Sequence, residues 1–173
     1  MKATQQLKEE HEGVLLMLRI LAEVSRELAT IGTIAKEHFE GILEFLKVFV
    51  DKCHHGKEEE LLFPALVKVG IPHDGPIAAM LFEHEMGRKY IRVMTDAFER
   101  YKLKDASAAS AIVQNAQAYI ELLTEHIDIL FSLSICSLSI LIKKIIFFLP
   151  WLTTGCQEKL KRLFMTALKR LKS

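Results

Sequence analysis

Apolar residues recur every three or four positions along the first 128 residues, which is the spacing of helices with one buried face. Short stretches rich in glycine, proline or small polar residues interrupt this pattern at 32–33, 70–76 and 104–107. The pattern predicts helices from about Thr4 to about Thr30, from Thr33 through the run 53–64, from Asp74 or Gly75 to about Lys102, and from about Asp105 onward. Four long amphipathic helices with short links predict an all-α, antiparallel up-down four-helix bundle.

Two polar residues interrupt the apolar face of the second predicted helix. His54 and Glu58 are four residues apart, so they lie one turn apart on the same face, in line with Leu43, Leu46 and Val50. A charged carboxylate on a buried face is costly unless it is paired or binds a metal. For this pair alone, a His–Glu hydrogen bond near the surface is an equally good interpretation.

The other three predicted helices each place one histidine on the apolar face. His11 follows the stripe of Val14 and Leu18, His84 follows that of Met80, and His126 follows that of Leu122 and Leu123. A single core histidine is usually satisfied by a hydrogen bond, whereas four of them beside a carboxylate are hard to explain without an ion. In an antiparallel bundle the four can meet at one end.

The remaining histidines and the acidic run receive simpler interpretations. His55 follows His54 by one residue and, at about 100° per residue in an α-helix, is expected to face solvent or to support the site from outside. His38 is expected at the surface and His73 in a loop. The run Glu58-Glu59-Glu60 predicts a solvated face except at Glu58.

At these residues the chain resembles the hemerythrin-like, HHE cation-binding family, over about residues 1–128. The resemblance rests on His11, on His54-x3-Glu58 followed by Leu62-Phe63-Pro64, on Glu83-His84-Glu85 and on Glu125-His126-Ile127-Asp128. It implies a four-helix bundle that holds two non-haem irons. It also implies that the metal ligands are His11, His54, Glu58, His84 and His126, with Glu58 as a bridging carboxylate.

The chain departs from the family pattern after Asp128. The family has a second His-x3-Glu followed by Leu-Phe-Pro, but Leu130 stands where that glutamate is expected. Because leucine offers no donor and the bridging charge is lost, the resemblance predicts a weakened or single-metal site. Residues 129–173 form an apolar stretch and then a basic amphipathic tail, which complete or extend the fourth helix. The apolar stretch predicts self-association.

Two interpretations of the residues after about Asp128 stay open: a divergent natural tail, and a stretch read out of frame after a local duplication. The codons allowed for Ser137 to Trp151 permit, when read from each third base, the peptide Thr-Glu-His-Ile-Asp-Lys-Glu-Asn-Asn-Ile-Leu-Phe, followed by Ala or Thr and then Met. That peptide repeats the residues at 124–128 and contains the missing glutamate and Leu-Phe, but not the proline. In the second interpretation the basic amphipathic tail is accidental.

Composition narrows the function classes. The formal net charge of +1 gives no bulk electrostatic reason to bind nucleic acid, and Lys143-Lys144 interrupts the apolar stretch, which makes a membrane span unlikely. Three cysteines without paired spacing argue against a disulfide framework, and the first residues lack an apolar signal region, so a cytoplasmic location is expected.

Nitrogen and carboxylate ligands without thiolate suit iron, manganese or zinc. The resemblance favours iron that binds or senses oxygen or a related diatomic such as nitric oxide, more in the manner of a binding protein than of an enzyme. Two alternatives stay open: an iron donor, repair, or peroxide- or nitric-oxide-reducing protein, and a structural bundle with a mononuclear metal.

The reading-frame interpretation makes a prediction about the gene. If it is right, the codons for residues 137–151 encode the metal-binding repeat in the alternate frame, so their third bases are the particular ones this peptide needs. Nucleotide sequencing of the gene checks this. Third bases incompatible with that peptide would leave the divergent tail as the interpretation.

Overall fold

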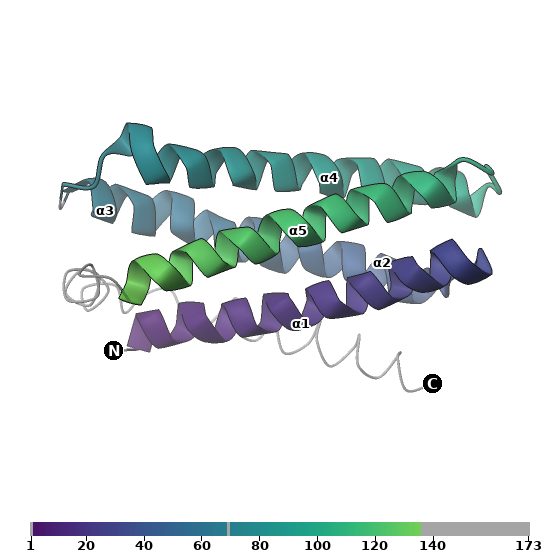
Figure 1. Cartoon of the computed structure of the whole chain (residues 1–173), viewed down its shortest axis with the longest axis horizontal. Coiled ribbons are helices and arrows are strands. Elements are labelled where there is room, and N and C mark those ends of the chain that lie inside the picture. The colour runs from purple at the N-terminus through teal and green to yellow at the C-terminus, as the bar shows by residue number, and fades with distance from the viewer. Residues whose placement is uncertain (1, 69, 136–173) are drawn as a thin grey trace.

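The computed structural model describes residues 2–68 and 70–135, and side chains within 6–68 and 70–129. Its long helices are α1 (Lys2–Ile31), a composite second helix that begins with α2 (Lys36–Phe45), α4 (Ala78–Lys102) and α5 (Ala108–Ile135). Successive helices cross the view in opposite directions (Figure 1). α5 packs against both α4 and α1. The predicted all-α four-helix bundle is therefore confirmed.

The second long helix is not α-helical throughout. After α2 the backbone widens into the π-helical η1 (Leu46–His55), and after Gly56 and Lys57 into the π-helical η2 (Glu58–Leu62), before α3 (Phe63–Lys68) completes it. The backbone of Gly56, Lys57 and Phe63 stays helical, so the helix continues past Phe63 although Pro64 follows it. A π-helix bonds each N–H to the carbonyl five residues back, and such turns frequently occur at functional sites.

The connections lie where the sequence predicts them, although two helices begin later than predicted. Gly32 adopts a φ of 79° and Gly70 one of 97°, left-handed values that glycine adopts without strain. The second long helix begins at Lys36, after an extended Ala35 with no side-chain cap, rather than at Thr33. The link from α3 to α4 contains η3 (His73–Ile77), and α5 begins at Ala108, three residues later than expected.

Apolar side chains form two separate clusters. The larger runs along all four long helices and includes Leu21, Phe39, Phe49 and Phe98, each 0 to 1 % exposed. The smaller cluster consists of Phe63, Leu66, Ile77 and Met80, near the connection between α3 and α4. Among the described residues, no helix has both the length and the apolar character that crossing a bilayer requires.

Gly87 offers a test of how tightly α4 and α5 pack. A Cβ atom at this buried position would lie 3.5 Å from Cε2 of Tyr119, an ordinary contact distance. We expect Gly87→Ala to raise the free energy of unfolding by roughly 0.5–1 kcal/mol, because alanine loses less backbone entropy in a helix. Urea denaturation measures it. Gly32→Ala is the matched control and should destabilise, since its φ is positive; a destabilised Gly87→Ala would mean that the contact with Tyr119 is tighter than described.

Candidate metal centre

Six buried side chains from the four long helices meet at one end of the bundle. His11 comes from α1, His54 and His55 from the end of η1, Glu58 from η2, His84 from α4 and His126 from α5. All six are at most 5 % exposed. The structure thus brings together all five residues that the sequence singled out, and it adds His55.

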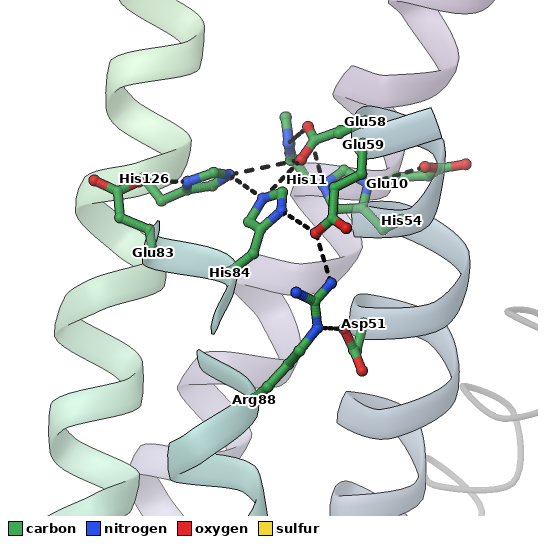
Figure 2. Close-up of polar contacts among 10 residues, drawn as sticks. All are labelled: Glu10, His11, Asp51, His54, Glu58, Glu59, Glu83, His84, Arg88 and His126. Atoms are coloured by element: carbon green, nitrogen blue, oxygen red, sulfur yellow. Dashed lines mark hydrogen bonds and ion pairs between the residues drawn. The ribbon is translucent and has the colours of Figure 1, made fainter. Parts of the chain in front are cut away.

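Glu58 lies at the centre of this cluster, with one carboxylate oxygen turned to each side (Figure 2). Oε1 lies 3.7 Å from Nε2 of His11 and 3.6 Å from Nε2 of His54. Oε2 lies 3.2 Å from Nε2 of His84 and 3.7 Å from Nε2 of His126. Neither oxygen makes a hydrogen bond to the described residues. The carboxylate therefore spans two sets of imidazoles without being satisfied by either.

The ligand atoms form two groups, in each of which they lie close enough together to bind one metal ion. Ligand atoms of His11, His54 and Glu58 lie within 4.8 Å of one another, and so do those of His55, His84 and His126. Three or more nitrogen and oxygen donors that face a common point are the minimum for a bound transition metal. The geometry can accommodate two ions, one on each side of Glu58.

Three of the histidines are anchored from behind by carboxylates. Nδ1 of His54 lies 3.0 Å from Oε2 of Glu10, Nδ1 of His84 lies 2.8 Å from Oε1 of Glu59, and Nδ1 of His126 lies 2.7 Å from Oε2 of Glu83. A carboxylate can only accept, so each Nδ1 carries the hydrogen. This arrangement is the usual way in which a metal-binding histidine is oriented by an outer partner.

These hydrogen bonds leave the Nε2 lone pairs of the histidines facing one another, which is unfavourable. A neutral imidazole that donates from Nδ1 has a bare lone pair on Nε2. The Nε2 atoms of His84 and His126 lie 3.4 Å apart, and both face Oε2 of Glu58. Acceptors gathered in a buried place repel one another unless a proton or a metal ion lies among them. The chemistry of this donor set therefore fits a cation.

The pKa values show how strongly the site is tuned by burial and charge. Burial lowers the pKa of His11, and it lowers that of His55 well below its usual range, so both are neutral and able to bind a metal. Burial would raise the pKa of Glu58, but the surrounding histidines outweigh it and the pKa falls well below its usual range. Burial would lower the pKa of His126, but Glu58 and Glu83 raise it.

The comparison with known families is decisive on one point. The family model for the hemerythrin HHE cation-binding domain matches residues 2–129. The chain belongs to the hemerythrin HHE cation-binding family. Comparison with curated proteins and with solved structures gave no match. Family membership and the buried His/Glu cluster together indicate a cation-binding bundle.

Two sequence expectations about this hemerythrin-like site need correction. His55 does not face solvent, because it is 2 % exposed and its ring centroid lies 3.8 Å from that of His84. Successive residues turn by roughly 80° in a π-helix rather than about 100°, so neighbouring side chains diverge less. Both His54 and His55 therefore turn inward from η1. Glu59 is not purely solvated either, since it bonds to both His84 and Arg88.

The anchoring carboxylates are the residues that sequence reasoning missed. Glu10, Glu59 and Glu83 each stand one residue before or after a candidate ligand, but each bonds to a histidine on another helix. Periodicity describes one helix at a time, so it gives no signal for such pairs. A second spacing did hold a clue, because His55 and Glu59 repeat the His-x3-Glu spacing of His54 and Glu58.

Two of the three anchors, Glu59 and Glu10, are themselves held in place by cations. Arg88 donates from Nη2 to Glu59 at 2.5 Å and from Nε to Asp51 at 2.7 Å (Figure 2). Lys57 donates to Oε1 of Glu10, which also accepts from Nε2 of Gln6 at 3.0 Å. The cationic partners offset the negative charge of the anchors.

Leu130 lies outside the side chains that the structure describes, and residues 136–173 lie outside the described residues altogether. The expectations about the second carboxylate and about the apolar and basic tail therefore stay predictions. The backbone at position 130 is helical, within α5.

The buried Glu10–Lys57 pair predicts a stability effect. Burial would raise the pKa of Glu10, but its bonds to His54 and Lys57 lower it. We expect Lys57→Met to lower the free energy of unfolding of the metal-free protein by about 2–3 kcal/mol at pH 7, because a buried carboxylate loses its cation. A carboxyl with a depressed pKa gives its full stabilisation above its unfolded pKa and loses it as the pH falls through the lower folded pKa, so the effect should shrink below the usual value of 4.5 and disappear once Glu10 is protonated in the folded protein.

Urea denaturation at pH 7 and at acidic pH measures this difference. Lys52→Met is the matched control, because Lys52 is an exposed lysine on the same helix. Equal stability of the Lys57 and Lys52 variants at pH 7 would contradict the account of Glu10.

Proposed function

We propose that this hemerythrin-like protein holds non-haem iron, with Glu58 between two metal positions, and that it binds or senses oxygen or a related diatomic such as nitric oxide. The observation that carries the proposal is the meeting of imidazole lone pairs and both Glu58 oxygens in a buried cluster. Membership of a cation-binding family supports the same conclusion.

The donor set favours iron over metals that prefer soft ligands such as thiolates. Neither of the two candidate groups contains a thiolate, and imidazole with carboxylate suits iron, manganese and zinc. Among these three, iron would supply reversible one-electron chemistry and coordination positions open to a small molecule. The protein's own part is to orient the imidazoles through Glu10, Glu59 and Glu83 and to keep the surroundings apolar.

The apolar surroundings favour a small uncharged ligand. The site lies between the two apolar clusters, and the ring of Phe63 stacks near that of His84 with centroids 5.8 Å apart. A diatomic gas crosses such packing more readily than a charged or bulky substrate does. Turnover of peroxide or nitric oxide by the iron-loaded protein would instead favour the reducing alternative.

The protein's cellular environment and its assembly follow from its cysteines and from the apolar stretch after Asp128. We propose a reducing, cytoplasmic environment, supported by the odd number of cysteines in the sequence and by their lack of paired spacing. Self-association through the apolar stretch after Asp128, without a nucleic-acid or membrane partner, remains our proposal for assembly.

Removal of His54 tests the site directly. We expect His54→Ala to lower the iron content sharply, because one imidazole donor is lost and Glu10 no longer has its histidine partner. Iron per chain is measured by elemental analysis after anaerobic loading with ferrous iron. His73→Ala, which changes an exposed histidine, is the control. Unchanged iron stoichiometry in the His54 variant would remove His54 from the site.

Metal affinity should depend on pH. Neutral imidazole is the form that binds, so protons compete with the metal as the pH falls through the histidine range. Burial would lower the pKa of His126, but Glu58 and Glu83 raise it above 6.5, so this competition should begin above that pH. Ferrous-iron titration between pH 8 and 5.5 measures the change. A pH-independent affinity would mean that histidines do not supply the donors.

A further inference from the structure

His55 differs from the anchored histidines of the cluster in one respect. His54, His84 and His126 each have Nδ1 fixed by a carboxylate, whereas neither ring nitrogen of His55 has a hydrogen-bond partner among the described residues. Its side chain is nevertheless only 2 % exposed. A buried imidazole with both nitrogens unsatisfied is costly, and such a group calls for a ligand that the protein alone does not supply.

The position of His55 indicates what that ligand is. Its donor atom lies within 4.8 Å of those of His84 and His126, and the ring centroids of His55 and His126 are 5.9 Å apart. Oε2 of Glu58 faces His84 and His126 on the same side. Without His55, this side would offer only two imidazoles and one shared oxygen.

The π-helical backbone accounts for the placement. An α-helix would turn His55 away by about 100° from His54, but η1 and η2 widen the helix around both residues. One helix thereby supplies a nitrogen to each side of Glu58, with His54 on the side of His11 and His55 on the side of His84. The second histidine of this helix thereby takes the place of a donor from the fourth helix, where the sequence has Leu130 four residues after His126.

We propose that His55 is a direct nitrogen ligand of the second metal position, which it completes together with His84, His126 and Oε2 of Glu58. The inference rests on the proposed metal-binding function and deepens it. The chain then binds two metal ions with five imidazoles and one carboxylate, instead of the weakened or single-metal site expected from Leu130.

The geometry sets one requirement for this role. The rings of His55 and His84 are stacked with centroids 3.8 Å apart and an interplanar angle of 10°, so their lone pairs lie in two nearly parallel planes and do not converge on one point. Binding one ion with both requires the ring of His55 to turn about its side-chain bonds. No hydrogen bond to the described residues holds the ring back.

Zinc is a suitable probe, because it accepts imidazole and carboxylate donors and is diamagnetic. Long-range proton–nitrogen NMR spectra of the full chain, with ¹⁵N-labelled histidine, report the ring nitrogens before and after loading with zinc. Comparison with His55→Gln assigns the His55 signals. We expect one His55 ring nitrogen to shift on addition of the second zinc equivalent, in the manner of the nitrogens of His84 and His126.

Zinc titration of the variants gives the second readout. The unaltered chain should bind two equivalents, and His55→Gln should bind the second more than about 100-fold more weakly, since loss of an outer partner alone costs about 10- to 100-fold. His73→Gln should match the unaltered chain. Circular dichroism checks that the variants fold, and the NMR result on the unaltered chain stands even where His55→Gln does not.

The outcomes separate this inference from the function on which it rests. An unaltered chain that binds no zinc and no iron would overturn the proposed function itself. A chain that binds metal but leaves the His55 signals unchanged, or a His55→Gln variant that keeps two tight equivalents, would overturn only the role of His55.

Discussion

The arrangement of this bundle depends on one buried carboxylate. Glu58 is 1 % exposed, and its two oxygens face four imidazole nitrogens at 3.2 to 3.7 Å. An ionised carboxylate buried in apolar surroundings persists only where a cation or a shared proton compensates it. The four long helices each contribute a histidine that faces this carboxylate, so the requirement of one side chain fixes how all four helices are aligned at this end.

The outer partners distribute the charge of the site toward the surface. Behind the imidazoles stand Glu10, Glu59 and Glu83, and Lys57 and Arg88 neutralise the first two of these. Lys57 and Arg88 are 13 % and 26 % exposed, against at most 5 % for the candidate ligands. The cations that face the anchors are thus more exposed than the candidate ligands, whereas the anchors themselves range from 2 % exposed for Glu10 to 26 % for Glu59. These outer ion pairs connect the polar centre of the bundle to its hydrated surface.

The sequence predicted what depends on a single helix and failed where two helices or a change of helix type are involved. Periodicity located the four long helices and placed His11, His54, Glu58, His84 and His126 on inward faces, because a repeat of three or four residues reports directly on burial. It did not show that His55 is buried beside His84, since a fixed 100° step does not describe a π-helix. It gave no sign of Glu83 as a partner of His126, because that bond joins residues 43 apart.

The π-helical stretches also determine how α2 and α3, the two ends of the second long helix, are rotated relative to each other about the helix axis. Each residue in a π-turn advances by roughly 20° less than in an α-turn, so the 15 residues of η1 and η2 accumulate a large difference in phase. Phe39 in α2 and Leu66 in α3, on either side of these stretches, are both buried. Removal of one residue between them would rotate one end against the other and turn an apolar face to solvent, so the length of this segment is as constrained as its composition.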